Sequence, residues 1–253
     1  MEFYTRDLKR VDLDVNFQSL INSGSFSNVY KSNDLAVKLY NDYSNWTNNP
    51  MMTEKKFDRI SSVKSDNFIE LHDLIMKTDD NDIVKGIKGK NFRIDGYTAR
   101  YYEADNKNPM YKPSSYFISN IVSLQDLIEE LTQKGIILND VDVPNTILTK
   151  DNIVIIDPDL YDITLDLSDI FCRFAISELK GERHSTKKIK LSNAYEILWL
   201  IRLLMYEHSS ELKDDVLKYF DEFNGYNSID CIEQVKKDLC RVRTPIEMFE
   251  RRR

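Results

Sequence analysis

The spacing of apolar residues divides the chain into a β-type part and a helical part. Between residues 11 and 102 the apolar residues occur in short runs separated by Asn, Asp, Gly and Ser, a pattern that predicts strands and turns. One helix is expected among them, from about Thr53 to Val63, because Phe57, Ile60 and Val63 recur every three residues. The expected strands cover residues 17–21, 28–30, 35–40, 68–74, 83–86 and 97–102.

After residue 108 the pattern becomes mainly helical. Ser123 is expected to cap a helix over Leu124–Gln133, with Gly135 just past its end. A hairpin of two short strands, Thr146–Leu148 and Ile153–Ile156, comes next. The remaining helices are expected at residues 170–178, 191–206, 212–223 and 229–241. The fold class is therefore α+β, with a β-rich lobe over residues 1–102, a hinge near 101–105 and a mainly helical lobe over 103–253.

The composition excludes several classes of protein. A chain of 253 residues that is 42% hydrophobic, with only 7 Gly and 6 Pro, is neither collagen-like nor disordered. Its net charge of −7 argues against a nucleic-acid partner, which needs a basic face. The charged N-terminus lacks the apolar core of a secretory signal, and no segment is apolar enough to suggest a membrane partner. Three cysteines without metal-ligand spacing fit buried thiols in a reducing, cytoplasmic compartment.

Two features of the β-type part could bind phosphate. The Ser/Gly-rich segment 22–29 lies between two expected strands, so it is a hairpin loop rather than the strand-to-helix turn of a dinucleotide or Walker motif. Its small residues would let backbone amides approach a polyphosphate, although the same composition also suits an ordinary turn. Lys38 lies in the apolar strand 35–40, where its ammonium must pair or reach water. Glu54 is its expected carboxylate partner, with Asp58 and Glu70 as rivals.

The segment from Gly135 to Asp159 carries the strongest chemical signal. Asp140 is followed five residues later by Asn145, a hairpin comes next, and Asp157 ends its second strand. Carboxylate and amide oxygens that converge at strand ends suit Mg²⁺ that keeps phosphate ligands. The alternative is a pair of polar turns that cap a hairpin. One such turn would be unremarkable, but the order and spacing of the two together favour a metal site.

Taken together, these motifs resemble the protein-kinase family. Segment 22–29 occupies the place of the glycine-rich loop, and Ala36-Val37-Lys38 that of the strand with the ATP lysine. Asp140 and Asn145 match the D-x-x-x-x-N of the catalytic loop, and Asp157 matches the Asp of DFG. The matches are spread over residues 17–160, with Ala99 at the gatekeeper place. The resemblance implies a two-lobed kinase-like fold.

The resemblance also implies roles and cofactors, namely ATP and Mg²⁺. Asp140 would orient the attacking hydroxyl or accept its proton, Lys38 would bind phosphates, and Asn145 and Asp157 would hold the metal. Asp159 is either a further metal ligand or a turn residue. The expected nucleotide-contacting residues are Gly24, Ser25, Phe26, Ser27, Val29, Lys38, Glu54 and Tyr101.

Departures from the kinase pattern keep three functions open. Leu138 and Asn139 replace the His and Arg of HRD, Asp142 stands where a Lys is usual, and no APE motif is found. The leading expectation is an ATP- and Mg²⁺-dependent kinase of protein Ser/Thr. The first alternative is a kinase of the aminoglycoside or choline type, with a small-molecule hydroxyl as acceptor. It is favoured by the missing APE motif, by the acidic Asp157-Pro158-Asp159 and by the short helical region after Asp159. A nucleotide-binding pseudokinase is the second.

The acidity of the chain is concentrated around these motifs. Residues 101–180 hold 14 acidic and 6 basic residues, an excess larger than that of the whole chain. This window contains Asp140, Asp142, Asp157 and Asp159. Such a charge would repel ATP unless a cation neutralised it, so metal dependence is expected.

Overall fold

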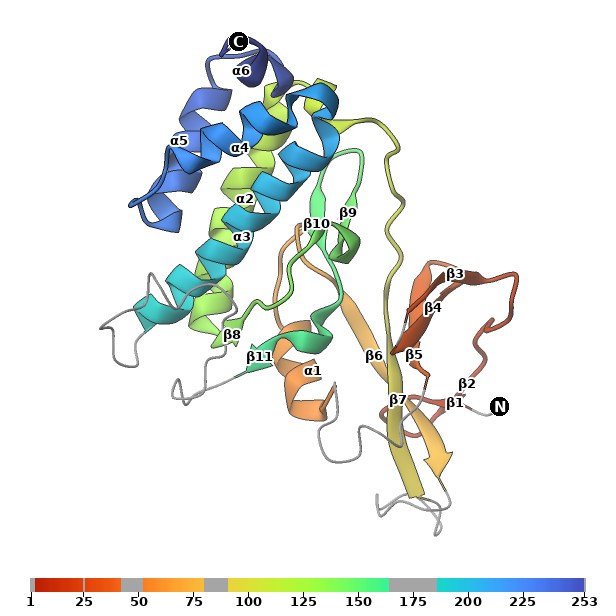
Figure 1. Ribbon diagram of the computed structural model, residues 1–253. Coiled ribbons are helices and arrows are strands. Elements are labelled where there is room, and N and C mark those ends of the chain that lie inside the picture. The colour runs from red at the N-terminus through yellow and green to blue at the C-terminus, as the bar shows by residue number, and fades with distance from the viewer. Residues whose placement is uncertain (1–2, 25, 42–51, 80–90, 164–185, 253) are drawn as a thin grey trace. The chain divides into compact units, whose positions relative to one another are not determined.

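The computed structural model describes residues 3–24, 26–41, 52–79, 91–163 and 186–252 (Figure 1). Contacts between residues divide the chain into two units. The first, called the N-terminal unit here, comprises Met1–Lys64 and Ile69–Tyr102. The second, the C-terminal unit, comprises Ser65–Phe68 and Glu103–Arg253. The N-terminal unit is rich in β-structure and the C-terminal unit is mainly helical, so the protein is of mixed α and β type.

The N-terminal unit is built on a seven-stranded antiparallel sheet with the order β2-β1-β6-β7-β5-β4-β3. Strand β5 lies between β7 and β4, and it covers the same residues that its apolar run predicts. The strands are β1 (Phe3–Tyr4), β2 (Arg10–Val11), β3 (Leu20–Ser23), β4 (Ser27–Ser32), β5 (Leu35–Tyr40), β6 (Leu71–Asp79) and β7 (Asn91–Arg100).

The core of this unit follows from alternation along β5. Val37 and Leu39 point to one face of the sheet, where they are buried together with Phe3 and Ile75. The unit has one described helix, α1 (Glu54–Ser61), which the threefold apolar spacing predicts. Its N-terminus is capped by Thr53, whose Oγ1 accepts a hydrogen bond of 3.2 Å from the backbone N–H of Lys56.

The C-terminal unit consists of helices around two small sheets. Figure 1 shows α2 and α3 running side by side, and α3 also packs against α4 and α5. Short 3-10 helices at Pro109–Tyr111, Val143–Asn145 and Pro158–Leu160 connect the longer elements. Those elements are α2 (Ser114–Gln133), β8 (Ile136–Ile137), β9 (Thr146–Leu148), β10 (Ile153–Ile155), β11 (Asp162–Ile163), α3 (Thr186–His208), α4 (Lys213–Asp221), α5 (Ser228–Leu239) and α6 (Ile246–Glu250).

The start of α2 differs from the sequence expectation. The helix begins at Ser114 after Pro113, so Ser123 lies inside the helix and does not cap it. Its end agrees with the prediction, since Gly135 follows with φ +64°, the left-handed conformation that favours glycine. The two-residue strands β1, β2, β8 and β11 and the short helix α6 were not expected. The expected strand 83–86 and the expected helix 170–178 lie outside the described residues.

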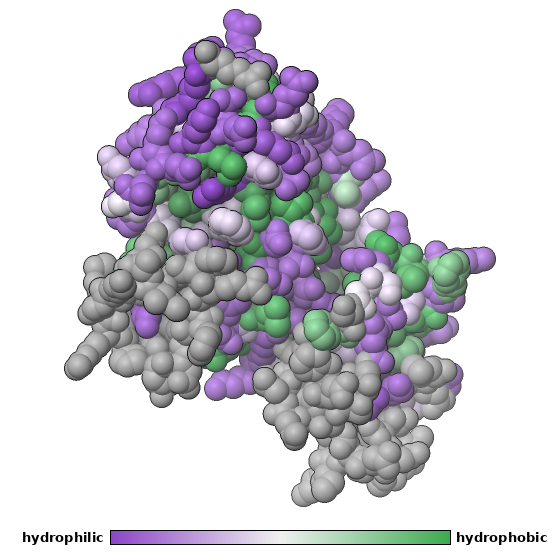
Figure 2. Space-filling view, viewed as in Figure 1, coloured by the Kyte–Doolittle hydropathy of each residue, from purple (hydrophilic) through white to green (hydrophobic). Residues whose placement is uncertain are grey.

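The surface of the described residues is mainly hydrophilic. Hydrophilic residues predominate around the C-terminal helices, and hydrophobic residues show through beneath them (Figure 2). Among the described residues, no helix has the length and apolar character needed to cross a bilayer. Cys231 is buried as expected, whereas Cys240 is exposed because it follows the last turn of α5. Cys172 lies outside the described residues.

Candidate functional site

The loop after β8 brings Asp140 and Asn145 into direct contact. The side-chain nitrogen of Asn145 donates to the backbone oxygen of Asp140 at 2.8 Å and to its carboxylate at 3.3 Å. The 3-10 helix Val143–Asn145 makes this contact possible, because it turns the chain back toward Asp140. Asp142 caps this turn, accepting a 2.6 Å hydrogen bond from the backbone N–H of Val143. Asp142 is therefore a turn residue in this structure.

The hairpin of β9 and β10 places Asp157 near the same loop. Thr146 pairs with Ile155 at the open end of the hairpin, and the N–H of Ile156 donates to the backbone oxygen of Asn145 at 2.9 Å. Asp157 is the next residue along the chain. Its carboxylate accepts from the backbone N–H of Asp159 at 3.5 Å.

Both aspartates of the motif adopt backbone conformations that are uncommon outside glycine. Asp140 has φ +60° and Asp157 has φ +59°. Aspartate tolerates the left-handed region better than most residues, but a protein rarely uses it without a structural or functional reason. Here the left-handed residues lie at the beginning of the loop and at the end of the hairpin, where each turns the chain sharply.

Tyr161 is a buried tyrosine that contacts the backbone just before Asp157. Its side chain is 2% exposed, and its hydroxyl donates to the backbone oxygen of Ile156 at 3.3 Å. Burial raises the pKa of the Tyr161 hydroxyl well above its usual range. Four surrounding carboxylates raise it further, those of Asp157, Glu196, Asp140 and Asp159. The negative charge of the predicted Asp140, Asp157 and Asp159 is therefore felt at this buried hydroxyl.

Helix α3 supports the loop with polar residues that the sequence analysis did not identify. The Asn193 side chain accepts from the N–H of Leu138 at 2.9 Å and donates to the oxygen of Ile136 at 3.0 Å. Glu196 accepts from the N–H of Val141 at 3.4 Å. Both side chains are almost fully buried, at 0% and 4% exposure. The signal that could have revealed them is a polar residue just before the most apolar stretch, 194–205, and a carboxylate inside it.

The donor atoms of this loop suit a hard divalent cation. Because the Asn145 nitrogen is committed to Asp140, the carbonyl oxygen of Asn145 is the atom of that side chain that can bind a metal. Carboxylate and amide oxygens are the ligands that Mg²⁺ prefers. Within the described ranges, however, no group of three or more His, Cys, Asp or Glu side chains is placed to hold a metal. The residues therefore fit Mg²⁺ that brings other oxygen ligands, such as phosphates and water.

Lys38 in the N-terminal unit is buried rather than facing solvent. It lies on β5, an interior strand of the sheet, and is only 7% exposed, so its ammonium does not reach water from a sheet edge. Its ammonium lies 5.9 Å from the ring centroid of Tyr97, the residue opposite it on β7. The next residue on that strand, Gly96, approaches Lys38 so closely that an added Cβ would lie 1.9 Å from its backbone oxygen.

The expected pair between Lys38 and Glu54 is not formed among the described residues. Glu54, at the start of α1, instead lies 3.6 Å from the guanidinium of Arg6. Arg6 also pairs with Asp58 one turn further along the helix. Glu70, the other rival, pairs with Arg100 at 3.5 Å. The sequence analysis missed Arg6 because its charge lies far from α1 in the chain.

The loop expected to hold phosphates is a hairpin between β3 and β4, as predicted. The backbone N–H of Gly24 donates to the oxygen of Ser27 at 2.9 Å, so the hairpin itself uses that amide. Phe26 at the tip is 51% exposed, and Ser25 lies outside the described residues. Val29 faces Lys38 across the β4–β5 pair. The hairpin thus places Val29 beside Lys38.

Tyr101 follows β7 at the end of the N-terminal unit. Its backbone N–H donates to the oxygen of Asp34 at 2.9 Å, and the ammonium of Lys31 lies 4.0 Å from the centroid of its ring. The proposed gatekeeper, Ala99, is 2% exposed on the same strand end. The backbone of Tyr101 is therefore held by the turn between β4 and β5.

Comparison with known proteins gives little further information. No family model matches the chain, and no curated protein sequence matches it. Among solved structures, the kinase PK-1 of the Cydia pomonella granulovirus is similar over 76% of this chain and 70% of that chain. The two share 16% sequence identity with a TM-score of 0.44. A likeness at this level identifies neither a family nor an activity.

Proposed function

We propose that the protein is a phosphotransferase that uses ATP and Mg²⁺ to phosphorylate a hydroxyl group, with protein Ser/Thr as the acceptor. The observation that carries this proposal is the hydrogen-bonded pair of Asp140 and Asn145. The hairpin that follows holds Asp157 one residue beyond the backbone contact to Asn145. The spacing that resembles the kinase catalytic loop is therefore matched by a compact arrangement of the side chains.

Each residue of the loop has a distinct role in the proposal. Asp140 would orient the acceptor hydroxyl and accept its proton. A general base can do this only when it lies within hydrogen-bond reach of that hydroxyl. The carbonyl oxygen of Asn145 and the carboxylate of Asp157 would hold Mg²⁺, with Asp159 as a further candidate ligand. The metal, when bound, supplies positive charge that neutralises the phosphates.

The N-terminal unit would supply a fixed positive charge. Lys38 is buried on an interior strand, and a buried ammonium binds an anion more strongly than an exposed one because water screens it less. In the proposal this ammonium binds the phosphates of ATP. The hairpin with Gly24, Ser27 and Val29 and the backbone near Tyr101 would contact the rest of the nucleotide.

A second candidate function is a nucleotide-binding pseudokinase that acts through interactions. It is favoured by the pairing of Glu54 with Arg6 in place of Lys38, and by the use of the Gly24 amide within its own hairpin. Both features remove contacts that would hold phosphates in a kinase. A small-molecule hydroxyl acceptor is the other alternative, and the segment 164–185 that would distinguish acceptors lies outside the described residues.

The test compares the wild-type protein with two aspartate variants of the same hairpin. Each is incubated with γ-labelled ATP and Mg²⁺, alone and with added protein or aminoglycoside and choline acceptors. Asp157→Ala should abolish label transfer, whereas Asp151→Ala should retain it, because Asp151 is an exposed residue at the opposite end of the hairpin. Label on protein supports a protein kinase, and label on a small molecule supports the alternative. Nucleotide binding without any transfer would overturn the proposal in favour of a pseudokinase.

A further inference from the structure

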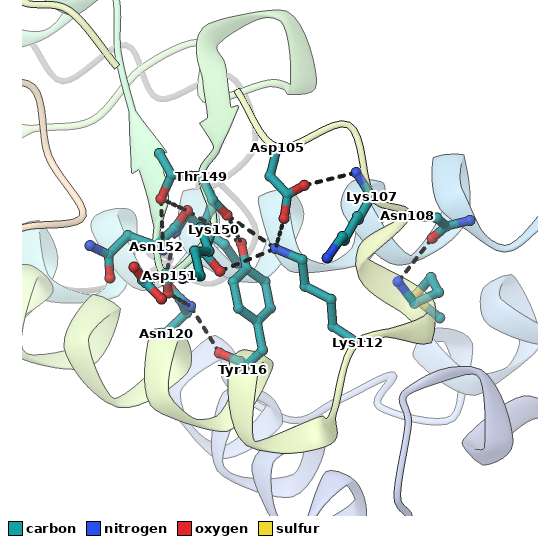
Figure 3. A network of polar contacts seen from close by, with 12 residues as sticks. Asp105, Lys107, Asn108, Lys112, Tyr116, Asn120, Thr149, Lys150, Asp151 and Asn152 are labelled. Atoms are coloured by element: carbon teal, nitrogen blue, oxygen red, sulfur yellow. Dashed lines mark hydrogen bonds and ion pairs between the residues drawn. The ribbon is translucent and has the colours of Figure 1, made fainter. Parts of the chain in front are cut away.

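The turn of the β9–β10 hairpin is held by three side chains that stand four residues apart. Lys112 precedes α2, and Tyr116 and Asn120 lie on the first turns of that helix. All three point toward the turn residues 149–152 (Figure 3). We call Lys112, Tyr116 and Asn120 the hairpin clamp.

Lys112 ties the turn to the segment that enters the C-terminal unit. Its ammonium donates to the backbone oxygens of Thr149 at 3.0 Å and Lys150 at 3.4 Å (Figure 3). It also forms an ion pair of 3.0 Å with Asp105, and the side chain of Lys112 is only 10% exposed. The backbone N–H of Asp105 in turn donates to the oxygen of Leu148, the last residue of β9, at 2.7 Å. One lysine thus joins residues from separate parts of the chain.

Tyr116 bridges the two sides of the turn. Its hydroxyl lies 3.3 Å from the oxygen of Thr149 and 3.2 Å from that of Asn152. Burial raises the pKa of this hydroxyl above its usual range, so it keeps its proton and remains a donor. The ammonium of Lys112 lies 3.8 Å from the centroid of the same ring, which adds a cation–π contact.

Asn120 holds the first residue of β10. Its side-chain oxygen accepts from the N–H of Ile153 at 2.6 Å, and its nitrogen donates to the oxygen of Asp151 at 3.0 Å. Asn67 donates to the same Asn120 oxygen at 2.7 Å and to the oxygen of Ile153 at 2.8 Å. Asn67 and Asn120 are 1% and 2% exposed. A buried network of this kind fixes the direction of a strand more sharply than apolar packing does, since hydrogen bonds are directional.

The clamp and the candidate metal ligands lie at opposite ends of the same short hairpin. Asn145 directly precedes β9, and Asp157 follows shortly after β10. Strands of three residues span only about 10 Å, so a shift of the turn is carried directly to the open end. We propose that Lys112, Tyr116 and Asn120 are positioning residues that set how Asn145 and Asp157 are presented to Mg²⁺. This inference rests on the proposed function, because it assigns the clamp to the same metal-dependent site.

The test measures metal binding rather than activity. The probe is Mg²⁺ titrated in the presence of a non-hydrolysable ATP analogue, with nucleotide-dependent stabilisation against thermal unfolding as the readout. Tyr116→Phe removes the hydroxyl but keeps the ring. We expect it to raise the half-saturating Mg²⁺ concentration about 10-fold, the usual effect of losing a group that orients metal ligands.

The matched control is Tyr219→Phe. Tyr219 is also a buried tyrosine of the C-terminal unit, and its hydroxyl donates at 3.1 Å to Asp238, away from the hairpin. It should lower thermal stability without changing the half-saturating Mg²⁺ concentration. Lys112→Met provides a second variant with the Tyr116 hydroxyl intact, and Lys112→Arg should restore part of the metal affinity because it retains the cation.

The outcomes separate the two proposals. Weaker Mg²⁺ binding in Tyr116→Phe and Lys112→Met, with normal binding in Tyr219→Phe, supports the positioning role. Wild-type Mg²⁺ dependence in both clamp variants would show that the network serves stability alone and would overturn the inference. A wild-type protein that shows no Mg²⁺-dependent nucleotide binding would instead overturn the proposed function, and the inference with it.

Discussion

The catalytic-loop region of the C-terminal unit and the nucleotide-binding region of the N-terminal unit differ in how far the expected contacts are formed. In the C-terminal unit, Asn145 bonds to Asp140, and the open end of the hairpin brings Asp157 beside them. In the N-terminal unit, Lys38 is buried, but its expected partner Glu54 pairs with Arg6.

The difference has a physical origin in how each contact is made. The C-terminal contacts lie within one stretch of chain, where a loop, a hairpin and two left-handed aspartates fix the geometry locally. A contact between Lys38 and Glu54 requires the sheet and α1 to take one particular arrangement. A ligand that binds one arrangement more tightly shifts the population toward it. The geometry of the C-terminal loop is therefore fixed by contacts close in the chain, whereas a pair between Lys38 and Glu54 would require Glu54 to leave Arg6.

The largest effect is expected from a change inside the loop that holds Asp140 and Asn145. Asp140→Asn keeps the shape of the side chain but removes the base that receives the hydroxyl proton. Phosphate transfer should fall by about 10²–10⁴-fold, the usual contribution of general base catalysis. Single-turnover kinetics with labelled ATP measures it. Transfer within about 2-fold of wild type would mean that Asp140 has no role in the chemistry.

A substitution at Gly96 should test how closely β5 and β7 approach each other beside Lys38. Gly96→Ala places a Cβ 1.9 Å from the Lys38 oxygen and 3.1 Å from the Leu39 Cα, so β5 and β7 must move apart. Overpacking of this kind costs about 3 kcal/mol of unfolding free energy. Gly24→Ala is the matched control, because its nearest contact would be an ordinary 3.6 Å. Denaturant unfolding of both variants gives the difference, and equal stabilities would contradict the close approach of the two strands.

The support from α3 should matter mainly for stability. Asn193→Ala leaves the N–H of Leu138 and the oxygen of Ile136 without their partner in a buried site. Leaving buried polar groups unsatisfied costs about 2 kcal/mol. Thermal or denaturant unfolding measures the loss. Asn193→Asp, which keeps an acceptor for the Leu138 N–H but faces the Ile136 oxygen with a buried carboxylate, should be no more stable than Asn193→Ala. Wild-type stability in Asn193→Asp would contradict a role for the donor to Ile136.

The hairpin and its motif could be predicted from the sequence because their signals are local. Apolar runs separated by turn residues define β5, β9 and β10, and the spacing of Asp140, Asn145 and Asp157 lies within one segment. The start of α2 could not be read in this way. Its first buried positions include Ser114 and Asn120, whose polarity hides the apolar period.

The polar contacts between segments far apart in the chain also could not be predicted from the sequence. Arg6 reaches α1, and Asn193 reaches the residues beside β8, through the tertiary fold. The polarity of Asn193 beside an apolar stretch marks it as unusual, but nothing in the sequence indicates which groups Asn193 or Arg6 binds. The four-residue spacing of Lys112, Tyr116 and Asn120 did offer a signal, since Tyr116 and Asn120 share one face of α2 and Lys112 lies just before it. The function of this spacing can be inferred only from the structure, which shows that the hairpin turn lies against the three side chains.

The smallest effect is expected at Glu54, and it is the sharpest test of the comparison. Since Glu54 is exposed and pairs with Arg6, Glu54→Gln should change the transfer rate by less than about 2-fold, as for most surface ion pairs. Glu70→Gln is the control, because Glu70 is an exposed carboxylate paired with Arg100 in the same unit. Equal, small effects in both variants would mean that Lys38 acts without Glu54. A large loss in Glu54→Gln alone would mean that α1 rearranges when ATP binds and that Glu54 exchanges Arg6 for Lys38, so that the N-terminal unit, too, completes a kinase-like site.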